Sequence, residues 1–294
     1  MSRAKYGLYL GCMIQVEQYA YEMSTISVLD KLSVSWEYLP IQTCCGHPIR
    51  NVNSFAWLSM AGRILAKGAE LGIDLCVPCT GCSLSLEEAN RVLAENTALR
   101  EKVNQVLAVE NLEYQPTQVR HILQVLHDDI GIDPLKSHQV ATIEELRFAT
   151  HYGCHAIRPS SLPRVDHPEN PWKIERIMEG LQIATGDYPE RLDCCGGPTL
   201  LTDENLAIKM TGDKLQILPK WDFDGLVTIC PTCLKMYDGK QEMIARQLKN
   251  KTLQIPVVYL TQLVGLCLGI PQENLGLHLN LSPVYRLNQY LKKI

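Results

Sequence analysis

The chain has 294 residues, of which 46% are hydrophobic and 20% are charged, and its formal net charge is -4. These proportions are typical of a globular protein, and the length allows either one large core or two domains of ordinary size. The small negative charge gives no electrostatic reason to expect nucleic-acid binding.

Signals for membranes or secretion are weak in this sequence. No window approaches the roughly 18 uninterrupted apolar residues that a transmembrane helix requires. The apolar run at residues 6–10 is too short for a signal-peptide core followed by a cleavage site, and it fits a first buried strand better. We therefore expect a cytoplasmic protein, whose 12 cysteines stay reduced and act as ligands or catalysts rather than as disulfides.

Short apolar segments alternate along the chain with segments of helical spacing. Strands are expected at residues 6–10, 34–38, 73–77, 148–152, 225–229 and 255–259. Helices are expected at residues 17–32, 54–65, 172–185, 206–218 and 260–268. Strands that alternate with helices predict an α/β fold in which parallel sheets are flanked by helices. In such sheets the chemistry lies at the carboxyl ends of the strands.

Two further stretches, residues 87–100 and 115–130, also have helical spacing. They form either an inserted helical hairpin at about residues 87–130 or helices that simply cover the core, and the second is the plainer explanation. Residues 159–171 contain four prolines and are expected to form a loop. The tail after Pro271 is weakly patterned, and we interpret it as a candidate docking segment for a partner.

The cysteines occur in two matching series. Cys12 corresponds to Cys154, Cys44-Cys45-Gly46 corresponds to Cys194-Cys195-Gly196, and the Cys79 and Cys82 pair corresponds to Cys230 and Cys233. The second series has a few extra residues before its adjacent cysteines, and the proline-rich loop accounts for them. The repetition predicts two pseudo-twofold-related repeats, residues 1–142 and 143–294, that carry the same kind of thiolate-bound metal.

Each half thus supplies five candidate ligands. The first set is Cys12, Cys44, Cys45, Cys79 and Cys82, and the second is Cys154, Cys194, Cys195, Cys230 and Cys233. A CxxC at the start of a helix directs two thiols toward one centre, where the helix N-terminal amides favour the thiolate. Zinc takes four such ligands, but adjacent thiolates chelate one tetrahedral ion poorly and can reach two irons of a cluster. The spacing therefore favours iron–sulfur over zinc.

Two cysteines remain outside these sets. Cys76 would complete a CxxCxxC with Cys79 and Cys82, but the second half has no equivalent residue, so we treat Cys76 as an addition without a ligand role. Cys267 lies on the apolar last helix, where we expect it to act as a small buried hydrophobe.

The doubled pattern resembles the CCG-domain family, in particular the B subunit of heterodisulfide reductase. The resemblance runs from Tyr9 to about Leu268, and its strongest stretches are Tyr9-Leu10-Gly11-Cys12, His151-Tyr152-Gly153-Cys154-His155 and the two Cys-Cys-Gly blocks. It implies that each five-cysteine set binds one noncubane 4Fe-4S cluster, and that the two clusters face each other across the pseudo-twofold axis. A disulfide, such as the coenzyme M–coenzyme B heterodisulfide of methanogenesis, would lie between them. Each sulfur would be captured by one cluster as the bond splits, and two thiols would leave.

The same resemblance implies a catalytic iron–sulfur subunit of an oxidoreductase complex, with a ferredoxin-like C subunit and a flavin-binding A subunit as partners. No flavin or nucleotide motif is visible in this chain, so electrons would come from such a partner. Other relatives serve as electron-transfer subunits of lactate-, glycolate-, glycerol-3-phosphate- or succinate-linked enzymes, or act in sulfur oxidation. Those are the alternative functions.

Polar residues close to the cysteine blocks are further candidates. His155 follows Cys154 directly and is our candidate proton donor to a departing thiolate, because imidazole titrates near neutral pH. His47 is a weaker candidate, and for both residues the alternatives are a hydrogen bond to cluster sulfur or simple packing. Three nearby cations would contact anionic groups of a substrate or, more simply, be solvated surface charges: Arg50, Arg158 and Lys235.

Overall fold

The computed structural model describes residues 6–250 and 253–294, and within these ranges two parallel sheets of four strands form the framework. The first sheet contains β1 (Tyr6–Leu8), β2 (Trp36–Tyr38), β3 (Asp74–Val77) and β4 (Val119–His121) in the order β2-β1-β3-β4. The second contains β6 (Arg147–His151), β7 (Ala184–Thr185), β8 (Gly225–Thr228) and β9 (Val257–Tyr259) in the equivalent order β7-β6-β8-β9. The same order in both halves confirms the predicted α/β fold with a repeated parallel sheet.

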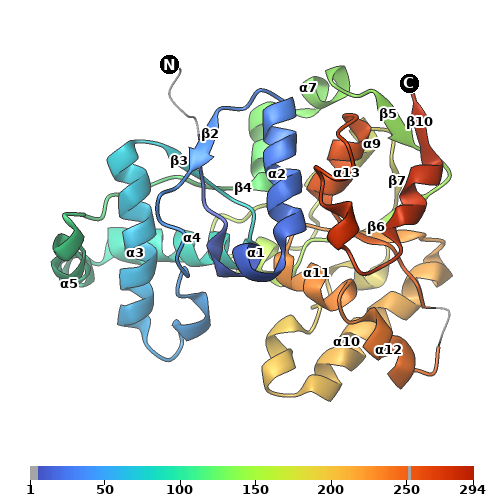
Figure 1. Ribbon diagram of the computed structural model, residues 1–294. Helices are drawn as coiled ribbons and strands as arrows, with labels where there is room; N and C mark the ends of the chain where they lie inside the picture. Colours follow the sequence, from blue (N-terminus) through green and yellow to red (C-terminus); the bar gives the residue numbers. More distant parts are fainter. Residues whose placement is uncertain (1–5, 251–252) are drawn as a thin grey trace.

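Helices flank both sheets (Figure 1). Those of the first half are α1 (Gly11–Glu17), α2 (Tyr19–Lys31), α3 (Ser54–Leu71), α4 (Thr80–Glu95), α5 (Thr97–Leu107), α6 (Ile122–Gln124) and α7 (Ile132–Ser137). Those of the second are α8 (Cys154–Ile157), α9 (Lys173–Gly180), α10 (Glu204–Ile217), α11 (Pro231–Tyr237), α12 (Gln241–Gln247) and α13 (Leu260–Cys267). In Figure 1, α3 and α5 lie on the left, α10 and α12 lie at the lower right, and α2 packs beside α13 in the upper middle.

The α2–α13 contact joins the two halves through buried polar and aromatic side chains. Tyr21 of α2 stacks on Tyr259 with ring centroids 3.9 Å apart, and its hydroxyl donates a 2.9 Å hydrogen bond to the carbonyl of Ile229. The hydroxyls of Ser24 and Thr261 are 2.7 Å apart beside this pair. Because buried polar groups need such partners, these bonds fix how one half sits on the other.

The prediction of a helix over residues 115–130 is wrong in its first part. This segment enters the first sheet as β4, in which Val119 is paired with Leu75 of β3, and only then turns into α6 and a π-helix at Val125–Ile130. The predicted helix at 87–100 is divided between α4 and α5, because Asn96 caps the second of them by accepting a hydrogen bond from the backbone N–H of Leu99. Residues 87–130 therefore contain the end of α4, then α5 and the fourth strand β4, in the same order as α11, α12 and β9 of the second half.

Other expected elements differ mainly at their ends. The predicted helix 17–32 starts earlier, as α1, and continues as α2, and the predicted helix 172–185 ends as α9 before the two-residue strand β7. Residues 159–171 form a loop, as expected. The C-terminal tail folds back onto its own chain, where β10 (Leu291–Lys293) pairs antiparallel with β5 (Ala141–Ile143). The last residues of the tail therefore pair with a strand of the same chain, so no partner protein is needed to explain their position.

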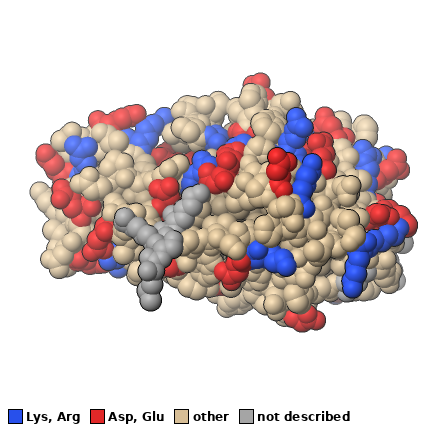
Figure 2. Space-filling model, turned by 90° about the horizontal axis from the view of Figure 1, so that it is seen from above, with Lys and Arg blue, Asp and Glu red and all other residues tan. Residues whose placement is uncertain are grey.

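Within the described residues, no helix is both long enough and apolar enough to cross a membrane. On the face seen in Figure 2, Lys and Arg side chains are interspersed with Asp and Glu. That face therefore has no extended patch of a single charge.

Candidate metal centres

The five cysteines of the first set lie on three segments that follow neighbouring strands. Cys12 is in the first turn of α1 just after β1, Cys44 and Cys45 are in the loop after β2, and Cys79 caps α4 after β3, with Cys82 in its first turn. The three strands are parallel, so their carboxyl ends meet at one edge of the sheet. The fold therefore brings three separated sequence blocks to one place.

Four thiols of the first set form a chain of neighbours. The Cys45 thiol is within hydrogen-bond distance of those of Cys44 and Cys82, and Cys82 is also within reach of Cys79. Hydrogen bonds from Cys44 and Cys82 hold the pKa of the Cys45 thiol well below its ordinary value. The bond to Cys45 raises the pKa of Cys44, and the exposed Cys12 is close enough to raise it further.

The second set repeats this arrangement on α8, the loop after β7 and α11. Cys154 and Cys195 both hydrogen-bond to Cys194, and these bonds, with the backbone N–H of Gly196, lower the pKa of Cys194. Cys195 is also within reach of Cys233, which contacts Cys230. The second set is thus a continuous group of five sulfurs, and the first is a group of four with Cys12 beside it. Three strand ends contribute the sulfurs of each set.

Two glycines allow the backbone to approach these sulfurs closely. Gly11 has φ +70° and Gly153 has φ +78°, a region that residues with a side chain rarely adopt. A Cβ atom on Gly11 would lie 2.5 Å from the Cys82 Sγ, and one on Gly153 would lie 3.1 Å from the Cys233 Sγ. The space beside both CxxC pairs therefore exists only because these positions lack a side chain.

The donor atoms fit a thiolate-bound metal. In the second set, the Cys195 and Cys233 sulfurs and a ring nitrogen of His151 all lie within 4.8 Å of one another, which is a spacing that one metal site can span. The thiols in both sets are mostly buried, and a buried group of adjoining thiols is the donor type that iron–sulfur clusters and zinc prefer. These side chains would bind a metal through sulfur rather than through oxygen.

The two cysteine sets lie on facing elements of the two halves. Helix α4, which carries Cys79 and Cys82, packs against α8, which carries Cys154, and α1 packs against α11. At the first contact the rings of His47 and His155 meet edge to face with centroids 4.6 Å apart. At the second, the Thr232 hydroxyl is 3.4 Å from the Met13 sulfur. Each helix that presents a CxxC therefore touches the first cysteine helix of the other half.

Both predicted histidines lie at this contact. A Cβ on Gly81 would be 3.5 Å from the His155 Nδ1 and 4.0 Å from the His47 ring, so both rings cover the start of α4. Burial lowers the pKa of His47, and burial together with the neighbouring His47 and Arg50 lowers the pKa of His155 to about 4.

The predicted cations are held by carboxylates or point to solvent. Arg50 forms an ion pair with Glu88, and Lys235 forms one with Glu17 at 2.5 Å across the α1–α11 contact. Arg158 is exposed. Of the two additional cysteines, Cys76 is buried in β3, Cys267 is buried in α13, and burial raises the pKa of each thiol to about 12.

Sequence reasoning missed two interactions beside the sets. Arg164, from the proline-rich loop, forms a buried ion pair with Glu87 of α4 and donates a hydrogen bond to the carbonyl of His155. His151 and the buried Lys214 form a second pair next to Cys233. The position of His151 three residues before Cys154 was a visible signal, whereas nothing in the sequence distinguishes Lys214 from other lysines on amphipathic helices.

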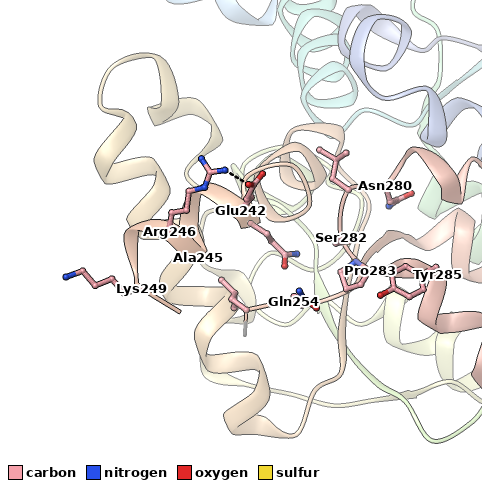
Figure 3. A pocket seen from close by; sticks show the side chains of 12 residues that line it. Glu242, Ala245, Arg246, Lys249, Gln254, Asn280, Ser282, Pro283 and Tyr285 are labelled. Atoms are coloured by element: carbon pink, nitrogen blue, oxygen red, sulfur yellow. Dashed lines mark hydrogen bonds and ion pairs between the residues drawn. The ribbon is translucent and has the colours of Figure 1, made fainter. Parts of the chain in front are cut away.

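A hollow of about 910 Å³ on the described surface has no cysteine in its wall. It lies between α12 and the C-terminal tail, and Figure 3 shows Arg246 paired with Glu242 along one side, with Asn280 and Tyr285 across from them. A smaller hollow of about 410 Å³ reaches the second set, because Cys194 is in its wall with Asp193 and Lys214. This hollow therefore gives a small molecule access to the second cysteine set from the side of Cys194.

Two repeated parallel sheets with five thiols gathered at each define a duplicated cysteine-rich protein. The chain belongs to the CCG family of cysteine-rich domains, whose family model matches residues 6–87 and 148–238. The two matched regions contain all ten cysteines of the two sets and exclude Cys267.

Relatives with established names cover nearly the whole chain. A protein of Archaeoglobus profundus, named as similar to the heterodisulfide reductase B subunit, is 33% identical over 92% of this chain and 93% of its own. The B subunit of the ferredoxin/F420H2-dependent CoB-CoM heterodisulfide reductase of Methanosarcina acetivorans is 30% identical over 98% of this chain and 100% of its own. The 8-methylmenaquinol:fumarate reductase membrane anchor subunit of Wolinella succinogenes is also 30% identical, over 96% of this chain and 99% of its own.

One solved structure has a similar fold. A hypothetical protein from Helicobacter pylori superimposes with a TM-score of 0.75 over 96% of this chain, at 13% sequence identity. The chain spans 54% of the length of that protein. At this level of identity the likeness concerns the fold alone.

Proposed function

We propose that this chain is the catalytic iron–sulfur subunit of a heterodisulfide reductase-type complex, which reduces a disulfide to two thiols. The observation that carries the proposal is the placement of two five-thiol sets on facing helices of a duplicated fold. The names of two near-full-length relatives support the reaction class. The substrate would be the CoM-S-S-CoB heterodisulfide or another disulfide of similar size.

In this proposal the ten cysteines hold two noncubane 4Fe-4S clusters. Cys12, Cys44, Cys45, Cys79 and Cys82 would hold the first, and Cys154, Cys194, Cys195, Cys230 and Cys233 the second, one in each of the repeats 1–142 and 143–294. Iron–sulfur is favoured over zinc because the five cysteine sulfurs of each set, including an adjacent pair, exceed what one tetrahedral ion takes. When bound, such clusters supply electrons singly, so that two of them match the two electrons that a disulfide needs.

The chain's own residues have to bring two protons to the departing sulfurs, because R-S-S-R′ plus two electrons and two protons gives R-SH and R′-SH. We assign the proton donor to His155, since its ring contacts His47 at the junction of α4 and α8, between the two sets. The carbonyl of His155 accepts a hydrogen bond from Arg164, which is itself held by Glu87. That contact fixes the backbone from which the imidazole projects.

The proposal also includes partners and location. Electrons would enter from a ferredoxin-like C subunit and ultimately from a flavin-binding A subunit, and the complex would be cytoplasmic. Both types of relative that match the full chain are named as subunits of larger enzymes, which supports a role inside an assembly.

The test begins with metal analysis of the anaerobically purified chain. We expect about eight iron and about eight sulfide per chain, because each proposed cluster contains four of each. Low-temperature EPR of the oxidised protein should then show a paramagnetic signal that is altered by the thiol products of a heterodisulfide and unaffected by an alcohol analogue of the same size. Two tightly bound zinc ions without iron would refute the proposal.

The second candidate is an electron-transfer subunit that binds clusters but no disulfide. The fumarate reductase relative is the observation that favours it. In that case the iron content stays the same, the clusters are reduced and oxidised normally, and thiols leave the EPR spectrum unchanged. The His155→Gln variant separates the two further. A disulfide reductase loses turnover and keeps its cluster spectrum, whereas a relay protein keeps its rate of electron transfer.

A further inference from the structure

The surroundings of the two cysteine sets differ at one pair of matched positions. Residues 43–64 of the first half align without a gap on residues 193–214 of the second. The alignment is anchored by Asn53 and Asp203, which cap α3 and α10 in the same way, and by Gly46 and Gly196, which both adopt positive φ. Lys214 therefore occupies the place that Ile64 has in the first half.

A second pair of matched positions lies at the carboxyl ends of β1 and β6. Gly11 and Gly153 both approach the second cysteine of the neighbouring CxxC, so Tyr9 and His151, each two residues earlier, are equivalent. In the first half the Tyr9 hydroxyl donates a 2.5 Å hydrogen bond to the carbonyl of Thr43, the residue before the adjacent cysteines. One neutral side chain thus satisfies that carbonyl.

In the second half the same carbonyl is satisfied by a buried ammonium group. Lys214 Nζ lies 3.2 Å from the carbonyl oxygen of Asp193, the counterpart of Thr43, 3.1 Å from that of Arg191 and 2.9 Å from His151 Nδ1. A lysine ammonium has three N–H donors and no acceptor, so each donor has one partner. The rings of Tyr188 and Tyr237, with centroids 5.7 Å and 5.9 Å away, present further sites of attraction for a cation.

This contact determines which nitrogen of His151 faces the cysteines. Because Nδ1 accepts from Lys214, the ring proton is on Nε2, which lies 3.2 Å from the Cys233 sulfur. His151 therefore donates a hydrogen bond to a sulfur of the second set. In the first half, Tyr9 directs its hydroxyl to a backbone carbonyl instead.

Neighbouring charges do not cancel the effect of Lys214. Lys214 is 3% exposed, whereas the carboxylate of Asp193 is on the surface, where water and salt screen it. Arg191 is paired with Glu175 at 3.0 Å, so this second buried charge is already compensated. One backbone donor to sulfur is common to both halves, since Gly46 and Gly196 both donate to the first cysteine of the adjacent pair at 3.4 Å.

We infer that the second cysteine set, through the Lys214–His151–Cys233 chain, holds the more easily reduced of the two clusters. A buried cation and an N–H···S bond both stabilise the extra negative charge that reduction adds, and hydrogen bonds to sulfur are among the features by which a protein raises an iron–sulfur potential. At half reduction the electron then resides on the second set. This inference rests on the proposed function, because it requires a cluster in each set.

The test is a redox titration of the complete protein, followed by EPR, for the wild type and two matched variants. The double variant His151→Tyr with Lys214→Ile copies the first half's pair into the second. The single variant Lys214→Met keeps most of the side-chain volume and removes only the ammonium. In the wild type we expect two resolved midpoint potentials, with the second set at least tenfold preferred, which for a one-electron couple corresponds to about 59 mV.

The higher midpoint should fall in both variants, while the lower one stays in place and the iron content stays at the wild-type level. Tyr9→Phe, the control in the first half, should leave both potentials within error. Two results would overturn the inference and leave the proposed function intact, each with full iron content. In one, Lys214→Met leaves both midpoint potentials unchanged; in the other, it shifts the lower midpoint potential alone. Absence of iron from the wild type defeats the proposed function first.

Discussion

Replacing Gly11 by alanine should empty the first cysteine set while the second stays loaded. Gly11 has φ +70°, and placing a residue with a Cβ in this region costs about 1–2 kcal/mol. The new Cβ would also lie 2.5 Å from the Cys82 sulfur, closer than real Cβ contacts, so Cys82 has to move by about an ångström. Together these effects cost about 2 kcal/mol or more, which corresponds to roughly a thirtyfold weaker hold on the metal.

The measurement is iron per chain after anaerobic reconstitution, with EPR to identify the remaining cluster. Gly11→Ala should retain about half of the wild-type iron. Gly62→Ala is the matched control, because Gly62 is in the interior of α3, where its nearest neighbour is a Val103 methyl group that can shift. A Gly11→Ala protein with full iron content would refute the idea that a missing side chain maintains this site.

Three further predictions concern residues outside the sulfur contacts. Cys76→Ala should keep the full metal content, whereas Cys45→Ala should lose it from one set; metal analysis that shows equal losses would mean that Cys76 is a ligand. Arg164→Met should cost about 3 kcal/mol of unfolding free energy at pH 8, because it leaves the Glu87 carboxylate buried without its partner; the double variant with Glu87→Gln should recover much of this in urea unfolding. Burial raises the Glu87 pKa from 4.5 to about 7, so the folded state favours the protonated carboxyl. The wild type should therefore lose stability relative to Glu87→Gln as the pH rises from 4.5 to 7, by up to about 3 kcal/mol of unfolding free energy. A difference between the two proteins that stays constant over this pH range would contradict the prediction.

The sequence predicted the position of the cysteines in the fold because two local signals agree at each block. A short apolar run ends just before Cys12, Cys154 and each CxxC, and helical spacing begins just after these cysteines. The pattern therefore predicts that they lie at strand ends. Residues 115–130 gave no such agreement. Val119, Ile122 and Leu126 have helical spacing, but pairing of Val119 with β3 overrides that local preference, as tertiary contacts often do.

Contacts between distant residues were beyond the reach of pattern reasoning. Lys214 and His151 are 63 residues apart, on α10 and β6, and a lysine on an amphipathic helix is usually solvated. Strand β7 has two residues, too few to produce alternation. Arg164 and Glu87 come from different halves, and they form a buried pair only because α4 packs against α8. These features depend on the packing of elements, whereas the cysteine positions depend on the elements themselves.

Duplication of one parallel sheet accounts for both the likeness and the difference of the two sets. The carboxyl edge of each sheet gathers its own five thiols, and the cross-packing of α4 on α8 and of α1 on α11 turns the two edges toward each other. Once both copies lie in one chain, each matched position can change independently. At the two matched positions the first half has the uncharged Tyr9 and Ile64, while the second half has His151 and Lys214, which place a buried positive charge beside its cysteines. A symmetric pair of separate subunits would have to carry the same residues at both sites, so a difference between two sulfur sites that face each other requires that they be encoded twice.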